Sequence, residues 1–466
     1  MKLVYDVSEK PKFGQIILFA LQQLLAILAA TIAVPAIVGN GMSQSAALFG
    51  AGAGTLVYVA FTKAKSPVFI GSSFAFIGAM FAAFAGAVSA QAGFAGILIG
   101  AVFAGLVYVV IAIIVKIAGT RWVDKFMPKQ VIGPTVALIG LSLAVNAVGD
   151  LQSVIPTPTG NMTTVYDIAT GVASETPQYV ETVPYFAIIV GVFTLLVVCI
   201  ASVYGSKSMR LIPFIIGIIA GYALAAIFTV IGEKTGNASM ILCDFSVFEN
   251  IKIFEVPNFT FVEAFKGFSE IDGQYLTTVA VAFVPVAFVT FAEHLADHMN
   301  ISTIIEKDLI KDPGLHRSLL GDGIGNMIGA FFGGCANTTY GESIACVAVT
   351  KNASVVTIIC AAIMAMLISF FGPFVTFLGS IPTCVMGGVC MSLYGFIAVS
   401  GLKMIKNVDL DDNRNLFVVS VILVSGIGGL SLTFGDVTIT TIATALILGI
   451  IFNVILSGKK KKEQEK

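Results

Sequence analysis

Long apolar segments limit the folds that are open to this chain. They recur between residues 14 and 457, and most are about 20 residues long. Hydrophobic residues make up 57% of the chain and charged residues 11%, whereas soluble domains contain roughly 25% charged residues. A helix needs roughly 20 mostly apolar residues to cross a bilayer. The sequence therefore predicts an all-α protein with many membrane spans.

The apolar segments fall into two sets of seven, separated by a polar stretch. The first set is predicted near residues 14–38, 44–62, 68–88, 92–117, 130–149, 184–204 and 210–232. The second set is predicted near residues 277–299, 316–336, 338–351, 353–371, 373–401, 414–431 and 434–457. Fourteen transmembrane segments are expected in total.

The basic residues support this count. An even number of spans places both termini on one side, and the run Lys459–Lys462 indicates that this side is the cytoplasm. The cytoplasmic segments then contain all but three of the 26 Lys and Arg residues, the exceptions being Lys234, Lys252 and Lys266. We therefore expect a multi-pass protein of the cell membrane with cytoplasmic termini.

Because seven is an odd number, two consecutive repeats of seven spans must have opposite orientations in the membrane. The third span of each half opens with a polar, irregular segment: residues 71–76 read Gly-Ser-Ser-Phe-Ala-Phe, and residues 337–342 read Asn-Thr-Thr-Tyr-Gly-Glu. Such paired segments point to a transporter binding site near the midplane. Their backbone N–H groups and the following helix N-termini can donate to a polar ligand. Packing kinks remain an alternative interpretation.

Ionisable residues deep in the spans are few, and they cluster in residues 291–298. Glu293 and Asp297 are one helical turn apart and share a face, while His294 and His298 form a second pair on the neighbouring face. Intramembrane carboxylates are normally paired, protonated or functional, and one that must load and release a proton fits this position. Solvation at the cytoplasmic interface is the alternative for Asp297 and His298.

Glu342 is the second deep carboxylate, in the short segment after Tyr340-Gly341. Glu293 and Glu342 lie in separate spans and can converge on one ligand. Because carboxylates accept hydrogen bonds, that ligand presents N–H or O–H donors or is a cation.

Several other classes of protein are disfavoured. The net charge of −1 offers no basic surface for nucleic acid. The two histidines lack a third ligand and the Glu-first spacing of a zinc protease, so no metal site is expected. The seven cysteines form no C-x-x-C pair and are interpreted as packing residues. We found no nucleophile–base pair for an enzyme and no continuous polar stripe for a channel.

At these residues the chain resembles the nucleobase–ascorbate transporter family, in its bacterial uracil permease branch. The resemblance covers nearly the whole chain. It is carried by Leu21-Gln22-Gln23-Leu24, Gly71-Ser72-Ser73-Phe74-Ala75-Phe76, Ala292-Glu293-His294, Lys307-Asp308-Leu309, Asp312-Pro313-Gly314-Leu315-His316-Arg317, Asn337-Thr338-Thr339-Tyr340-Gly341-Glu342 and Met386-Gly387-Gly388-Val389.

The resemblance implies two inverted seven-span repeats arranged as a core domain and a gate domain, with a short strand and a helix in each of spans 3 and 10. Residues 1–149 would hold core spans 1–4, to about residue 118, and then gate span 5. The remaining segments would be gate spans 6–7 (150–232), an extracellular connection (233–276), core spans 8–11 (277–371), gate spans 12–14 (372–458) and a basic cytoplasmic tail (459–466).

The resemblance also implies a proton-coupled symporter that imports uracil by movement of the core against the gate, with H⁺ as coupling ion, no cofactor and a homodimeric state in the lipid membrane. Its substrate-binding residues would be Glu293, Glu342, Phe74, Gly341, Tyr340 and Ala30. Proton coupling would involve Glu293, Asp297 and His298.

Three departures from the family pattern bear on the site. Gln23 stands where many relatives have His, and Asp297 stands where a known type of uracil permease has His. Ser343 and Ala345 replace an Asn and a Gly of the family signature. Asp297 or His298 can take the proton role. A xanthine or uric acid permease, Na⁺ coupling and an anion exchanger of similar architecture remain alternatives, the last disfavoured because two acidic residues repel an anion.

Overall fold

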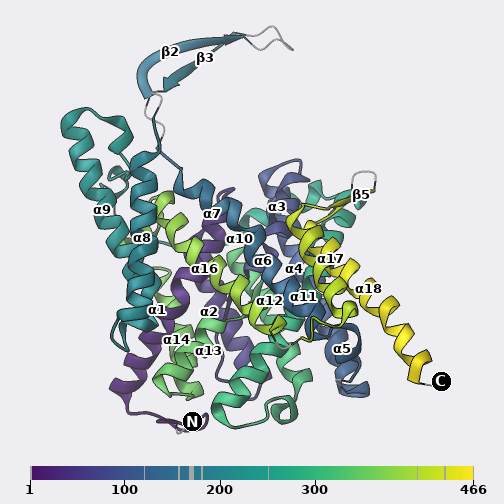
Figure 1. Cartoon of the computed structure of the whole chain (residues 1–466). Coiled ribbons are helices and arrows are strands. Elements are labelled where there is room, and N and C mark those ends of the chain that lie inside the picture. The colour runs from purple at the N-terminus through teal and green to yellow at the C-terminus, as the bar shows by residue number, and fades with distance from the viewer. Residues whose placement is uncertain are drawn as a thin grey trace. The chain divides into compact units, whose positions relative to one another are not determined.

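The computed structural model describes residues 3–119, 121–155, 158–166, 173–179, 182–249, 251–406, 408–434 and 437–464. Most of these residues are helical (Figure 1). The helices up to residue 235 are α1 (Phe13–Val38), α2 (Gln44–Phe61), α3 (Ile77–Ala85), α4 (Ala90–Ala118), α5 (Arg121–Phe126), α6 (Lys129–Ser142), α7 (Ala144–Leu151), α8 (Tyr185–Tyr204) and α9 (Pro213–Thr235). The later helices are α10 (Thr260–Gly267), α11 (Gly273–Ile305), α12 (Leu315–Gly333), α13 (Gly341–Thr350), α14 (Val355–Ile368), α15 (Gly372–Ser380), α16 (Thr383–Ile405), α17 (Asn413–Ile427) and α18 (Thr441–Gln464).

Eight helical segments of the described chain are long and apolar enough to cross a membrane. They are α1, α2, α4, α6 with α7, α8, α9, α11 and α16. Shorter apolar helices lie at 74–85, 341–350, 355–368, 413–427 and 441–457. The prediction of a helical, multi-pass architecture is confirmed, whereas the count of fourteen spans and the orientation of the termini stay predictions.

The structure differs from the predicted spans at residues 373–401 and at the start of the last helix, and it adds a hairpin between two predicted spans. The segment predicted at 373–401 is two helices, α15 and α16, because Pro382 disfavours a helical backbone at Ile381. The last helix begins at Thr441 instead of residue 434, after a hairpin of β5 (Leu432–Phe434) and β6 (Val437–Ile439). The polar loop after α7 contains a second hairpin, β2 (Pro158–Tyr166) and β3 (Ala173–Tyr179).

One set of residues used in the sequence analysis falls outside this description. The side chains of Lys459–Lys462, which indicated the side of the termini, are not among those that the structure describes.

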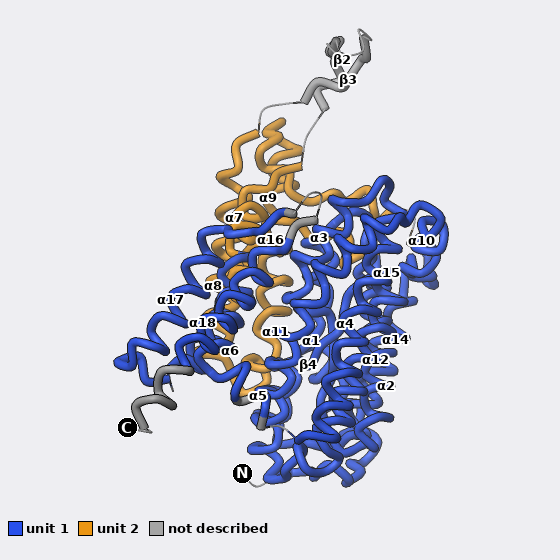
Figure 2. The backbone as a smooth tube through the Cα atoms, turned by 90° about the vertical axis from the view of Figure 1, so that its right-hand side faces the viewer, with its two compact units in different colours: residues 1–143, 252–375, 393–466 blue, residues 144–251, 376–392 orange. Residues whose placement is uncertain are grey.

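Backbone contacts divide the chain into two units, coloured separately in Figure 2. Unit 1 comprises residues 1–143, 252–375 and 393–466, and unit 2 comprises residues 144–251 and 376–392. The core and gate domains are defined by relative motion, so that division stays a prediction.

Close helix packing builds unit 1. Helix α2 packs against α12 and α14, and α4 packs against α11 and α12. At the α2–α12 contact, Gly54 faces Gly325: a Cβ added to Gly54 would lie 2.8 Å from the carbonyl oxygen of Gly325. Small residues let the backbones of membrane helices approach this closely.

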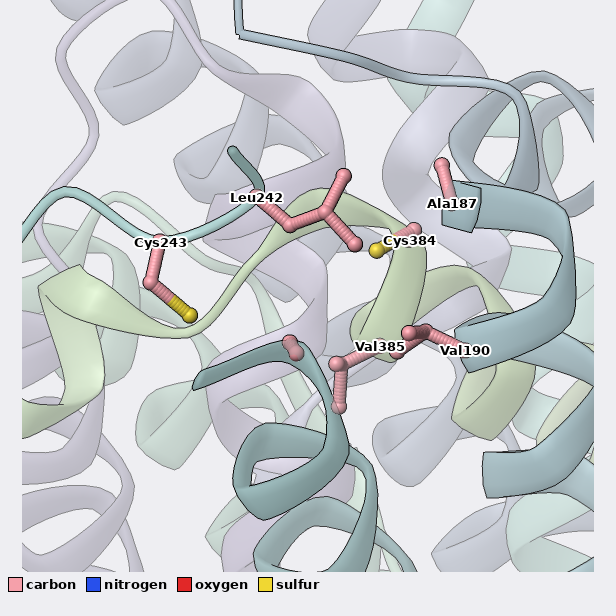
Figure 3. Packing of buried hydrophobic residues seen from close by; sticks show 7 residues of the cluster. Ala187, Val190, Leu242, Cys243, Cys384 and Val385 are labelled. Atoms are coloured by element: carbon pink, nitrogen blue, oxygen red, sulfur yellow. The ribbon is translucent and has the colours of Figure 1, made fainter. Parts of the chain in front are cut away.

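Unit 2 has its own apolar cluster around α8 and α9. Ala187 and Val190 of α8 pack with Leu242, Cys243, Cys384 and Val385 (Figure 3). The Thr229 hydroxyl of α9 accepts hydrogen bonds from the backbone N–H groups of Leu242 and Cys243, both at 3.0 Å. Cys243 and Cys384 are free thiols that pack as small apolar residues in this cluster.

Candidate substrate-binding site

The two irregular segments meet as a pair of short strands in unit 1. Strand β1 (Ile70–Ser72) pairs antiparallel with β4 (Asn337–Thr339), with Gly71 opposite Thr338. Both strands are buried, and each is followed by a helix: a 3₁₀ turn (Phe74–Phe76) and α3 after β1, and α13 after β4. The segments are therefore strand–helix elements rather than simple kinks. Antiparallel pairing is the relation expected of equivalent strands in two inverted halves.

The missing side chain of Gly71 makes room for Tyr340. A Cβ at Gly71 would lie 2.8 Å from two carbon atoms of the Tyr340 ring. The Tyr340 hydroxyl donates to the carbonyl oxygen of Ser72 at 2.8 Å and lies 3.5 Å from the Thr31 hydroxyl of α1. Gly71 thus lets the ring lie across β1, and the hydroxyl holds it there.

Two of the residues that depart from the family pattern contact each other. The Gln23 amide of α1 donates to the hydroxyl oxygen of Ser343 in α13. The same oxygen accepts from the backbone N–H of Phe69, just before β1, at 2.9 Å. Ser343 therefore joins α1, α13 and the start of β1, and it fixes the first turn of α13 where Glu342 lies.

A small cavity of about 50 Å³ lies at the ends of these strands. It is lined by Ser73, Phe74, Ala75, Ile139, Glu293, Thr338, Thr339, Tyr340, Gly341, Glu342 and Ile397. Five of the predicted substrate-binding residues, Glu293, Glu342, Phe74, Gly341 and Tyr340, are in this lining. Ala30 is buried in α1 and is not among the lining residues.

The charges of the lining are of one sign. Glu293 of α11 and Glu342 of α13 contribute two carboxyl groups, and the lining contains no Lys, Arg or His. The N-termini of α13 and of the turn after β1 also open here, and a helix N-terminus offers N–H groups without intrahelical acceptors. The site thus combines strong acceptors with backbone donors. It is far smaller than the 300–1,000 Å³ of sites for drug-sized ligands, so it suits a small polar ligand.

The structure separates the two candidates for proton coupling. The Asp297 carboxylate accepts a hydrogen bond at 2.8 Å from the hydroxyl of Thr339, a cavity-lining residue. His298 is fully buried, and its Nε2 lies 3.1 Å from the hydroxyl of Tyr58 in α2. Asp297 therefore contacts the lining of the cavity directly, whereas His298 belongs to a different set of contacts.

The contacts of His298 belong to a buried polar network that the sequence analysis did not identify. His294 Nδ1 lies 2.8 Å from Asp322 of α12, and His294 Nε2 lies 3.0 Å from Ser318. The rings of His294 and His298 stack with their centroids 4.3 Å apart. Tyr58 extends the network to Ser66 at 2.8 Å. Both nitrogens of His294 are thus used in hydrogen bonds within the protein.

One sequence signal pointed to Asp322. It is an acidic residue between two glycines in a predicted span, and intramembrane carboxylates are rare enough to be functional candidates.

The lining residues Ser73, Thr338 and Thr339 were quoted in the sequence analysis as parts of motifs but not as site residues, because their roles depend on the strand register.

Comparison with known proteins identifies relatives over the full chain. A family model described as Permease family matches residues 14–434. The uracil permease of Bacillus caldolyticus is 38% identical over 461 residues, which cover 98% of this chain and 96% of that protein. The uracil permease of Bacillus subtilis is 37% identical and covers 100% of this chain and 98% of the relative. That of Escherichia coli K12 is 33% identical, with coverage of 96% and 93%.

Solved structures share the fold at low sequence identity. The transmembrane domain of the cyanobacterial bicarbonate transporter BicA gives a TM-score of 0.60 at 15% identity, covering 96% of this chain and 99% of that domain. The murine anion transporter Slc26a9, solved in the inward-facing state, gives a TM-score of 0.64 at 13% identity, covering 97% of this chain and 70% of that one. These likenesses concern the architecture alone.

The relatives are named permeases and not enzymes, which agrees with a protein that binds and moves its substrate without bond chemistry. The apolar helices agree with a multi-pass membrane location. With the strand pair, the two carboxylates and the full-length relatives considered together, this chain belongs to the permease family that its motifs resemble, the nucleobase–ascorbate transporters.

Proposed function

We propose that this protein imports uracil together with protons across the cell membrane, by alternating exposure of one site to the two sides. The observation that carries this proposal is the placement of Glu293 and Glu342 on the lining of one small cavity beside two helix N-termini. The full-length relatives that are named uracil permeases support the choice of substrate.

The chemistry of the lining matches a pyrimidine dione. Such a ring presents N–H donors and carbonyl acceptors along one edge. Carboxylates can only accept when ionised, whereas backbone N–H groups can only donate. We propose that Glu293 and Glu342 accept from the ring N–H groups, and that backbone groups at Phe74 and Gly341 complete the hydrogen bonds. Tyr340 would form one wall of the pocket.

Asp297 is the favoured partner of Glu293 in proton coupling. Its carboxylate lies one helical turn from Glu293 and bonds to Thr339, so a change in its protonation reaches the cavity lining through one hydrogen bond. Among the described residues, the His298 ring bonds to Tyr58 and not to a residue of the cavity lining. We therefore assign the proton role to Glu293 and Asp297 and keep His298 as the alternative.

Anion exchange is the function of another class that the fold permits, since one of the structural neighbours is a bicarbonate transporter and another an anion transporter. The lining argues against it. Two carboxyl groups without a basic partner repel an anion, and no described lining residue supplies a compensating positive charge.

Uptake into proteoliposomes tests the proposal. Radiolabelled uracil uptake by the wild type is expected to increase with an inward proton gradient and to be largely lost in Glu342→Gln. Glu233→Gln, an exposed carboxylate in α9 of unit 2, is the matched control and should transport normally. Uptake that responds to an inward Na⁺ gradient and not to a proton gradient would identify Na⁺ as the coupling ion in place of H⁺. Transport of xanthine or uric acid without uracil would move the substrate to the purines, and transport of bicarbonate alone would contradict the nucleobase assignment.

A further inference from the structure

A second cavity in unit 1 has a chemistry opposite to that of the substrate site. Its volume is about 820 Å³, and it shares no lining residue with the small acidic cavity. Four parts of the chain enclose it: the N-terminal segment, the connection from α2 to β1, the connection from α11 to α12, and the start of α14. Nothing in the proposed transport cycle requires this cavity.

Lysines dominate its polar lining. The two acidic lining residues are Asp308 and Asp312, and the five basic ones are Lys10, Lys63, Lys65, Lys307 and Lys311. Their number gives the lining a clear positive excess. A phosphate or carboxylate group is therefore the complementary ligand.

Three of these lysines are already paired. Lys65 contacts Asp312 at 2.5 Å, Lys307 contacts Asp6 at 2.6 Å, and Lys311 contacts Asp308 at 3.1 Å. The first two pairs join segments far apart in sequence and hold walls of the cavity together, whereas the third lies within the connection from α11 to α12. Within the described residues, Lys10 and Lys63 have no acidic group within salt-bridge distance. The positive excess therefore rests on Lys10 and Lys63.

The backbone holds one of these two lysines in a defined turn. Lys63 and Ala64 both have left-handed backbone conformations, with φ of 53° and 55°. The Ala64 N–H donates to the carbonyl oxygen of Val59 at 2.9 Å and closes the end of α2. The position from which Lys63 extends is thus set by the fold, which lowers the ordering cost of binding.

The remaining wall is apolar. Val355, Val356 and Ile359 lie on the first turns of α14, one of the shorter apolar helices of the chain. Val356 and Ile359 are half-buried. A water-soluble anion gains nothing from such a wall, whereas an acyl chain does, at about 0.8 kcal/mol for each buried CH₂.

We propose that this cavity binds an anionic phospholipid, with the phosphate at Lys10 and Lys63 and an acyl chain along Val356 and Ile359 of α14. Basic pockets at the ends of membrane helices bind anionic headgroups in this way. In the predicted orientation, the lysine-rich segments face the cytoplasmic leaflet, which carries anionic lipid in membranes generally. The lipid would join the N-terminal segment to α2 and α14 through one headgroup.

Titration of the purified full-length chain in neutral detergent tests this site. The ligand is fluorescent dioleoylphosphatidylglycerol, and the variants are the double change Lys10→Gln with Lys63→Gln and a matched control, Lys207→Gln with Lys403→Gln. The control removes two exposed lysines that do not line the cavity. We expect affinity to fall about fivefold for each cavity lysine and to be unchanged in the control. Thermal unfolding of each variant verifies that it is folded.

Two further ligands separate the possible sources of the anion. Dioleoylphosphatidylcholine has the acyl chains without the net charge, and glycerol 3-phosphate has the charge without the chains. Weak binding of both supports the proposal. Equal binding of phosphatidylcholine, equal binding of glycerol 3-phosphate, or equal loss of phosphatidylglycerol affinity in the two double variants would each overturn it.

Discussion

The hydroxyl of Thr339 donates a hydrogen bond to the carboxylate of Asp297 at 2.8 Å, which links β4 to the long helix α11. Thr339 also lines the acidic cavity, and Glu293 lies one helical turn before Asp297. The contact thus connects the lining of the cavity to a carboxylate that departs from the pattern of the resembled family. In the proposed function, this contact would couple the protonation of Asp297 to substrate binding.

Asp297→Asn should uncouple transport from the proton gradient. The amide oxygen can still accept from Thr339, so the geometry is kept, but the side chain no longer titrates. We expect gradient-driven accumulation of uracil to fall at least tenfold, while equilibrium binding changes by only a few fold. The measurement is uptake into proteoliposomes at several external pH values, together with binding by calorimetry.

Thr339→Val is the companion variant, because it removes the donor and leaves the carboxylate. It should keep pH-dependent uptake and shift its midpoint. An Asp297→Asn protein whose uptake retains the wild-type pH dependence would exclude Asp297 as the coupling residue and leave His298 as the candidate.

Gly71→Ala should disturb the position of Tyr340. The new Cβ would lie 2.8 Å from the Tyr340 ring, so the ring or β1 must move. Overpacking of this kind costs about 1–3 kcal/mol. We expect a lower unfolding temperature in detergent and a weaker affinity for uracil. Gly78→Ala in α3 is the control, because nothing lies within 4 Å of its added Cβ. Equal behaviour of the two variants would show that the ring does not depend on Gly71.

Asp322→Ala should destabilise unit 1 more than Asp322→Asn. His294 is fully buried, and Asp322 is the partner of its Nδ1. Removing that partner leaves a buried polar atom unsatisfied, at about 1–3 kcal/mol. Asn keeps a carbonyl acceptor at the same place. Unfolding by SDS in mixed micelles compares the two, and a wild-type midpoint for Asp322→Ala would contradict the role of this pair.

The Asp6–Lys307 pair should make the attachment of the N-terminal segment dependent on pH. The Lys307 ammonium donates two hydrogen bonds to the carboxylate and lowers the pKa of Asp6 from its usual value of 3.8. Because the pKa is lower in the folded state, the contact stabilises the fold above about pH 4 and is lost as the pH falls through the folded value. Asp6 is 40% exposed, so the contribution is at most about 1 kcal/mol.

Hydrogen exchange of residues 4–7, which bond to residues 351–355, measures this effect. Lys307→Gln should speed exchange relative to the wild type at pH 7, and the ratio should approach one near pH 2. Lys311→Gln, which leaves Asp6 paired, is the control. A ratio that does not change with pH would show that the pair contributes nothing to the attachment.

The positions of the helices were predictable because apolar length is a local property. A helix overlaps every predicted span range, and the breaks at residues 71–76 and 337–342 were visible as polar interruptions. The local signal failed where structure depends on a few residues. The interruption at Pro382 and the hairpin before α18 were not predicted, because each lies in or beside an apolar run that looked continuous in the sequence.

The candidate site was predictable as a set of residues but not as a set of contacts. Glu293 and Glu342 stood out because a carboxylate is costly in a membrane span wherever its partner lies. Their convergence on one lining, and the absence of Ala30 from it, required the three-dimensional arrangement. The family resemblance supplied the remaining residues through motifs.

The sequence by itself determined that this is a multi-pass permease with acidic groups inside the membrane, because hydropathy, charge placement and motifs act along the chain. The tertiary structure decided which distant groups satisfy one another: Gln23 with Ser343, Asp297 with Thr339, and His294 with Asp322. Hydrogen-bond partners are selected by distance and angle, and residues on separate helices and strands acquire these only when the elements pack.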